Sequence, residues 1–243
     1  MSRGDRMEGR IVVFGATGYT GSLTARTLVE QGVRPVLAGR NAEALAALAD
    51  ELGGLETAYA DATEPQTVRA LVERDDVLVT TVGPFLRYGH AAVAAAIDAG
   101  AHYLDTAGES RFVRQVFEEY GVKASSAVLP AFGYDYVPGN LAGALALDRV
   151  GEEAVRVDVG YFFGGGSIIR GLSGGTLESA PGLLATRMYT YRDGIAEEPR
   201  SRVRDFAMAG RSRTSVSIGA SEHFTLPASY PGLREVNVYL GWL

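Results

Sequence analysis

Three glycines follow a short apolar run near the amino terminus, at a spacing that suits phosphate binding. The segment Gly15-Ala16-Thr17-Gly18-Tyr19-Thr20-Gly21 comes directly after Ile11 to Phe14, so a buried strand is expected to turn into a helix there. Glycines allow the tight turn and the close approach of backbone to a pyrophosphate, and the helix start offers unpaired N–H groups to the anion. The spacing differs from the G-x-G-x-x-G pattern, but its position after a strand predicts a dinucleotide site formed by all seven residues.

A basic residue at the end of the second expected strand indicates which dinucleotide would bind. Ala38-Gly39-Arg40 ends that strand, and no carboxylate lies between Val33 and Asn41 to accept from a ribose 2'-hydroxyl. Arg40 can instead pair with a 2'-phosphate and stack on adenine, which favours NADP. The alternative is a solvated arginine at a strand end. Asp61, after the third strand, suits the adenine amino group and a helix N-cap equally well.

Further polar groups follow other expected strands. Val82-Gly83-Pro84-Phe85 closes the fourth strand, and its glycine and proline suit a turn beside the nicotinamide. The loop Tyr88-Gly89-His90 and the segment from Phe132 to Asn140 lie at the same edge, where ligands of open α/β sheets collect. We expect the catalytic residues on the substrate side to be Tyr88, Asp135 and Tyr136. One of the two tyrosines would donate a proton; capping by the aspartate and wall positions for the tyrosines stay open.

The composition argues against several other classes of protein. A net charge of −6 over 243 residues argues against a nucleic-acid surface. The sequence has no cysteine, and its three histidines are scattered, so we expect neither thiolate chemistry nor a metal site. It lacks a Tyr-x-x-x-Lys pair, a G-x-S-x-G elbow and a P-loop. The amino terminus is charged and no stretch approaches ~18 uncharged apolar residues, so no membrane span and a cytoplasmic location are expected.

Short apolar runs alternate with helix-period segments up to about Leu147, which is typical of a parallel sheet with crossover helices. We therefore expect an α/β fold whose first domain, residues 1–148, is a doubly wound dinucleotide-binding Rossmann domain. Its strands are predicted at Arg10–Phe14, Pro35–Ala38, Glu56–Tyr59, Val77–Thr81, Tyr103–Asp105 and Ala127–Pro130. Its helices are predicted at Thr20–Gln31, Ala42–Leu52, Pro65–Glu73, Gly89–Ala99 and Arg111–Tyr120, with Gly32, Gly53 and Gly100 where helices end.

The remainder, residues 149–243, is rich in glycine and aromatic residues and predicts a smaller mixed α/β domain. Strands are expected at Val155–Phe163, Thr214–Ile218 and Glu235–Leu240, and a helix after Gly174-Gly175-Thr176. The last apolar run, Val236 to Leu243, invites pairing. It is expected to lie buried in the sheet or against a partner subunit, unless the natural chain is longer.

Six segments together resemble the saccharopine dehydrogenase-like oxidoreductases, nearest the bacterial branch that includes the trans-acting enoyl reductases. They are Ile11–Gly21, Ala38–Arg40, Val82–Phe85, Tyr103–Glu109, Phe132–Leu141 and Ser173–Thr176. The run Gly133-Tyr134-Asp135-Tyr136-Val137-Pro138 followed by Ser-Gly-Gly-Thr is the specific part, since the glycine loop alone also suits NmrA-like proteins. Members of the family are longer, which leaves open whether the substrate domain is complete in this chain.

The resemblance implies an NADP-dependent oxidoreductase acting on a small molecule, with hydride transfer to or from a C=N or activated C=C bond. It also implies a homodimer formed through the sheet of the second domain. By position, Gly15 to Gly21 would hold the pyrophosphate, Arg40 the 2'-phosphate, and Gly83 and Pro84 the nicotinamide side. Two alternatives stay open: an NADP-binding sensor or scaffold without catalysis, as in some NmrA-like regulators, and a domain fragment without turnover.

Overall fold

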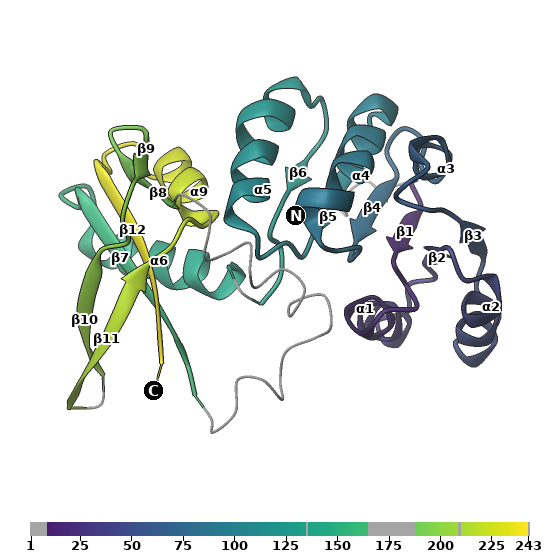
Figure 1. Ribbon diagram of the computed structural model, residues 1–243, viewed down its shortest axis with the longest axis horizontal. Helices are drawn as coiled ribbons and strands as arrows, with labels where there is room; N and C mark the ends of the chain where they lie inside the picture. The colour runs from purple at the N-terminus through teal and green to yellow at the C-terminus, as the bar shows by residue number, and fades with distance from the viewer. Residues whose placement is uncertain (1–8, 135, 165–187, 209, 243) are drawn as a thin grey trace, which may run out of the picture. The chain divides into compact units, whose positions relative to one another are not determined.

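The computed structural model describes residues 9–134, 136–164, 188–208 and 210–242. Within them the chain forms two compact units: residues up to 107 with 115–130, and residues 108–114 with those from 131 onward. Each unit contains one sheet, and the strands of both sheets are labelled in Figure 1. The units divide earlier in the sequence than the expected boundary between residues 148 and 149, because the helix before that boundary packs on one strand and one helix of the second unit.

The first unit is a parallel sheet of six strands in the order β3-β2-β1-β4-β5-β6. The strands are β1 (Ile11–Phe14), β2 (Val36–Gly39), β3 (Thr57–Tyr59), β4 (Val77–Thr80), β5 (His102–Asp105) and β6 (Val128–Leu129). In the registers of the central strand, Val13 pairs with Leu37 on one side and Val79 on the other. All six strands predicted from the alternating pattern are therefore found, within one or two residues at each end.

Helices connect these strands and supply much of the buried apolar surface. They are α1 (Tyr19–Glu30), α2 (Ala42–Glu51), α3 (Pro65–Arg69), α4 (Phe85–Ala99) and α5 (Ser110–Gln115), the last followed by a π turn η1 (Val116–Tyr120) and a 3-10 turn η2 (Gly121–Lys123). Val13 and Leu37 pack against Leu45 and Leu48 of α2 in a fully or nearly fully buried cluster. Gly100 ends α4 with φ of 73°, a left-handed angle that favours glycine.

Two predicted helix bounds are wrong, each for a local reason. Helix α3 ends at Arg69 rather than Glu73, because the carboxylate of Asp76 accepts from the Glu73 amide at 3.0 Å and holds that segment in a turn. Helix α4 begins at Phe85 rather than Gly89, because Pro84 occupies the N-cap and the Tyr88 amide donates to the Pro84 carbonyl at 2.9 Å.

Over the described residues, the second unit contains a mixed sheet, helices α6 and α9, and all of α5 except its last residue. Beyond α5, its elements are α6 (Val137–Val150), β7 (Arg156–Phe163), β8 (Met188–Arg192), β9 (Ile195–Glu198), β10 (Val203–Met208), β11 (Arg211–Ser217), α9 (Glu222–Ser229) and β12 (Glu235–Trp242). The three predicted strands are found as β7, β11 and β12. The helix expected after Thr176 lies outside the described residues. Strands β8, β9 and β10 and helices α6 and α9 were not predicted.

Strand β12 is the centre of this second sheet. It pairs in parallel with β7 along its whole length, and on its other edge it pairs antiparallel with β8 near its start and with β11 near its end. Val236 and Val238 are fully buried. The last apolar run, which was expected to lie in the sheet or against a partner subunit, is therefore buried within the sheet.

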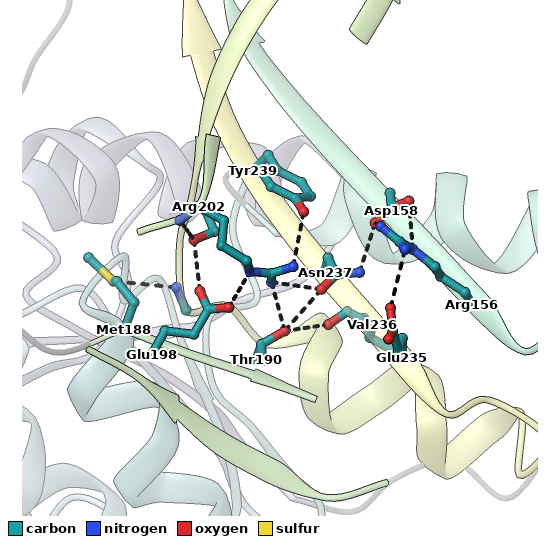
Figure 2. A network of polar contacts seen from close by, with 12 residues as sticks. Arg156, Asp158, Met188, Thr190, Glu198, Arg202, Glu235, Val236, Asn237 and Tyr239 are labelled. Carbon is teal, nitrogen blue, oxygen red and sulfur yellow. Dashed lines mark hydrogen bonds and ion pairs between the residues drawn. The ribbon is translucent and has the colours of Figure 1, made fainter. Parts of the chain in front are cut away.

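A polar network lies beside this central strand (Figure 2). The Arg202 guanidinium donates to Asn237 Oδ1 at 2.7 Å and to Glu198 Oε1, and Ser217 donates to the second oxygen of Glu198 at 2.7 Å. Thr190 donates to the Val236 carbonyl at 3.0 Å. Since Glu198 and Asn237 are buried, each depends on these partners to offset the loss of water.

Candidate functional site

The glycine segment lies at the point where the strand order of the first sheet reverses. Strand β1 has β2 on one side and β4 on the other, so the crossovers after β1 and β4 leave the sheet on opposite sides of one crevice. Thr81, just past β4, donates its amide to the Phe14 carbonyl at 2.9 Å. Its hydroxyl lies 3.3 Å from the carbonyl oxygens of Phe14 and Gly15. Thr81 thus fixes the glycine turn against the end of β4, a role that sequence reasoning missed.

The turn after β1 needs a glycine at its first position. Gly15 has φ of 88°, and a Cβ there would lie 2.7 Å from the Thr81 hydroxyl and 2.9 Å from a Val82 methyl. The amides of Gly15 and Ala16 both donate to the Ala38 carbonyl, at 2.9 and 3.2 Å. The turn is therefore tied to β2 as well as to β4, which holds its backbone in one conformation.

The turn leads directly into the amino terminus of α1. A Cβ on Gly21 would lie 2.1 Å from the Gly15 carbonyl oxygen, so only glycine lets the helix pack this closely on the turn. Gly18 is the N-cap and gives no side-chain hydrogen bond to the first helical turn. The amides at the start of α1 are thus left for another acceptor, as an anion site requires. Thr17, Gly18 and Tyr19 are exposed beside them, whereas Ala16 is buried.

Arg40 and Asp61 follow the neighbouring strands β2 and β3 at the same edge. Arg40 is exposed, and the pKa of Asp61 is lowered by hydrogen bonds from Thr63 and, to a smaller extent, by the charge of Arg40. Asp61 Oδ1 accepts these hydrogen bonds from the Thr63 amide at 2.8 Å and the Thr63 hydroxyl at 2.7 Å. Asp61 therefore closes the turn before α3 as a carboxylate. It is not the helix N-cap, which is Glu64.

The turn after β4 consists of Val82, Gly83 and Pro84, all half-buried, and Phe85 is the buried first residue of α4. The Gly83–Pro84 peptide is cis. The expected loop Tyr88-Gly89-His90 is wrong, since these residues lie inside α4. Tyr88 is half-buried one helical turn beyond Pro84, with the Arg87 guanidinium 4.9 Å from its ring centre. It stays on the first unit, close in sequence to the Val82–Pro84 turn.

Tyr136 belongs to the second unit, and Asp135 lies outside the described residues. Tyr136 is buried, and its hydroxyl donates to the Gly108 carbonyl at 3.2 Å. Its own carbonyl accepts from the Tyr161 hydroxyl at 3.1 Å and from Asn140 Nδ2 at 3.0 Å. The predicted substrate-side segment is thus held in place through both the side-chain hydroxyl and the backbone carbonyl of Tyr136.

A buried ionisable pair beside this segment was not found from the sequence. Glu222 and His223 begin α9, and burial raises the pKa of Glu222 to about 7 and lowers that of His223 to about 4. Glu222 accepts from the Tyr161 hydroxyl. Tyr161 and Glu222 are 61 residues apart in the sequence, and the sequence around Ser221 and Glu222 shows no pattern beyond that of a helix start.

In the part of the chain that the structure describes, no group of three or more acidic or histidine side chains could hold a metal ion. Over the same residues, the helices are too short or too polar to cross a bilayer.

Comparison with known proteins agrees with this geometry. Residues 11–128 match the family model of the saccharopine dehydrogenase NADP binding domain. The segment runs from β1 to β6 and contains every predicted cofactor residue. The first unit is therefore an NADP-binding Rossmann domain, and NADP is its cofactor.

The curated relatives carry the name of one activity. A Mycobacterium tuberculosis protein provisionally named a trans-acting enoyl reductase is 37% identical over 190 residues, which are 72% of this chain and 44% of the relative. The trans-acting enoyl reductase of Mycobacterium ulcerans is 39% identical over 143 residues, 55% of this chain and 34% of the relative. The chain thus matches less than half the length of either protein.

A solved structure extends the likeness to both units. Apo saccharopine dehydrogenase (L-Glu forming) of Saccharomyces cerevisiae aligns with 96% of this chain and 55% of its own, with a TM-score of 0.59 and 17% identity. At that identity the likeness concerns the fold alone. With the family model and the curated relatives, residues 11–128 belong to the saccharopine dehydrogenase NADP binding domain family, and the chain as a whole is similar to the saccharopine dehydrogenase-like oxidoreductases.

Proposed function

We propose that this chain carries the cofactor site of an NADP-dependent oxidoreductase that transfers hydride between NADPH and an activated C=C bond beside an acyl carbonyl. The observation that carries the proposal is the glycine turn on α1 at the switch point of the sheet, with Arg40 and no acid at the end of β2. The name enoyl reductase, borne by relatives 37–39% identical, favours C=C over the C=N alternative.

The proposed cofactor contacts follow the edge of the sheet. The backbone from Gly15 to Gly18 and the α1 amides of Tyr19, Thr20 and Gly21 would hold the pyrophosphate, since this helix start has free donors and a positive dipole end. Arg40 would bind the 2'-phosphate, and Asp61 the adenine amino group through the carboxylate oxygen that Thr63 leaves free. Val82, Gly83, Pro84 and Phe85 would lie along the nicotinamide.

When bound, NADPH supplies the hydride, so the protein has to orient the two reactants, exclude water and provide one proton. Tyr88 is the better of the two candidate donors. It lies one helical turn from Pro84, whereas the Tyr136 hydroxyl is engaged as the donor of a hydrogen bond to the Gly108 carbonyl. Tyr136 and Asp135 are proposed to line the substrate side. A homodimer through the second sheet and a cytoplasmic location stay predictions.

Cofactor selectivity tests the proposal directly. We expect NADPH to bind more tightly than NADH, and Arg40→Ala to reduce NADPH affinity about 10- to 100-fold, the range for losing a charge-assisted hydrogen bond to an anion, while NADH affinity changes little. Isothermal titration calorimetry measures both. Arg34→Ala is the matched control, because Arg34 is an exposed arginine that bonds the Gly53 and Gly54 carbonyls at the start of β2. Equal affinity for the two cofactors in the unaltered chain would contradict the assignment of Arg40.

Turnover is tested separately, with an enoyl thioester as acceptor and NADPH absorbance as the readout. We expect Tyr88→Phe to lower kcat about 10²-fold, a typical loss for a proton donor, without changing the NADPH dissociation constant. Tyr59→Phe, at an exposed tyrosine in β3, is the control. NADPH binding without consumption of any enoyl thioester would favour a sensor or scaffold over an enzyme.

A further inference from the structure

The start of α9 buries a carboxyl group that no cation neutralises among the described residues. Glu222 is 0% exposed, and its hydrogen-bond donors are uncharged: Tyr161 of β7 donates to Oε1, Ser221 lies 3.4 Å from Oε2, and the backbone amide of Glu222 itself also donates to the carboxyl group. Burying a charge without a counter-ion is costly, and hydrogen bonds to the carboxyl group offset part of that cost.

Three elements converge on this carboxyl group without room for a side chain between them. A Cβ on Gly139 of α6 would lie 1.9 Å from the Tyr161 hydroxyl oxygen and 2.5 Å from Glu222 Oε1. A second link runs beside it: Asn140 Nδ2 donates to Ser221 at 3.0 Å, and Asn140 Oδ1 accepts from Thr225. The start of α6 is therefore held to α9 and β7 by polar contacts at close range.

The Tyr161 hydroxyl has two acceptors and one proton. Its oxygen lies 3.1 Å from the Tyr136 carbonyl and closer to Glu222 Oε1. An ionised Glu222 attracts the proton more strongly, so the Tyr136 carbonyl loses the Tyr161 bond and keeps those from Asn140 Nδ2 and the Asn140 amide, each at 3.0 Å. A neutral Glu222 can donate its own proton to the Tyr161 oxygen, which frees Tyr161 to donate to Tyr136.

Among the ionisable groups around this carboxyl group, Glu222 is the one whose charge changes near neutral pH. Desolvation raises its pKa to about 7, and the pKa of Tyr161 is raised above its usual value, so that phenol stays protonated. The ionisable neighbours from the packed elements are Tyr136 before α6, Tyr189 and Tyr191 on β8, and His223, whose pKa is about 4. Asp148, at the far end of α6, bonds the Tyr230 hydroxyl. Glu235 and Tyr239 lie on the alternate face of β12 from Val236 and Val238.

We propose that Glu222 is a positioning residue for the segment that begins α6, because its charge state decides whether Tyr161 bonds to Glu222 or to the Tyr136 carbonyl. Protonation of Glu222 adds a bond from β7 to the start of α6, and ionisation removes it. The segment so held contains Tyr136. The consequence for activity rests on the proposed function, in which Tyr136 lines the substrate side.

Amide hydrogen exchange measured by NMR tests the inference without cofactor or substrate. The reporter is the Asn140 amide, which donates to the Tyr136 carbonyl. In the unaltered chain we expect its protection factor to be about 2- to 10-fold higher at pH 6 than at pH 8, the range for one net hydrogen bond, with a midpoint near pH 7. Glu222→Gln and Tyr161→Phe should each abolish this pH dependence.

The control is Glu153→Gln, which removes an exposed carboxyl group of the same unit. This variant should keep the step, that is, the change in the Asn140 protection factor between pH 6 and pH 8. Protection that does not change between pH 6 and pH 8 in the unaltered chain would overturn the inference, and so would a step that survives in Glu222→Gln. NADPH affinity, measured on the same samples, reports on the proposed function alone, so the two hypotheses can fail independently.

Discussion

Single residues differ in whether their role is local or depends on distant partners. Gly15 is explained by one backbone angle and two nearby atoms, and Asp61 by an amide two residues away. Glu222 is explained only by a tyrosine on another element, and the same burial that makes it depend on that tyrosine also raises its pKa. This last feature makes the stability of the protein depend on pH in a definite direction.

Glu222 is expected to lower stability as pH rises. Its pKa is about 4.5 when exposed and about 7 when folded, so between these values the folded chain holds a proton that the unfolded chain has lost. The free energy of unfolding should fall by about 3 kcal/mol across that window and then level off. Urea unfolding from about pH 5 to about pH 8 should therefore show Glu222→Gln gaining stability relative to the unaltered chain.

His223 contributes in the opposite sense. Its pKa is lowered from 6.5 to about 4, so its contribution to stability is lost as pH falls through this range. Because His223 is present in both chains, its effect cancels in the difference between them. A difference between Glu222→Gln and the unaltered chain that is constant with pH would show that Glu222 is not held neutral in the fold.

Among the elements, β1, the glycine turn and α1 act as one unit. The turn is tied to β2 through the Ala38 carbonyl and to β4 through Thr81, and Gly21 packs α1 directly on it. A change on the buried side of α1 should therefore move the turn, whereas one on its exposed side should not.

Gly21→Ala tests this coupling. The added methyl would lie 2.1 Å from the Gly15 carbonyl oxygen, so helix and turn must separate. We expect NADPH affinity to fall at least about 10-fold, equivalent to about 1.4 kcal/mol, with the helix content retained. Calorimetry and circular dichroism measure the two effects. Thr27→Ala, at an exposed position of the same helix, should bind NADPH like the unaltered chain.

For the molecule as a whole, the two units are expected to respond to different perturbations. NADPH bound to the first unit stabilises that unit by mass action. Arg202→Met instead leaves Glu198 of the second unit buried without its cation, which should cost about 3 kcal/mol. Hydrogen exchange followed by mass spectrometry should show NADPH protecting peptides of residues 11–107, and Arg202→Met loosening β8, β9 and β12. Loss of protection spread equally over both units in Arg202→Met would mean that they unfold together.

The sequence by itself determined the first sheet and its glycine turn. Strand alternation, glycines at helix ends and the run from Gly15 to Gly21 are signals carried by neighbouring residues, and all six strands follow from them. The position of Arg40 after β2 and of Val82 to Pro84 after β4 follows from the same signals.

The tertiary structure decided what depends on partners far apart in the chain. The centre of the second sheet is set by three strands that meet β12, and the environment of Glu222 by Tyr161, 61 residues before it. Local patterns record the conformation that each segment prefers. Long-range pairing and burial depend on which segments meet in space. These contacts determine the charge of Glu222 and whether Tyr161 bonds to Glu222 or to the segment that begins α6.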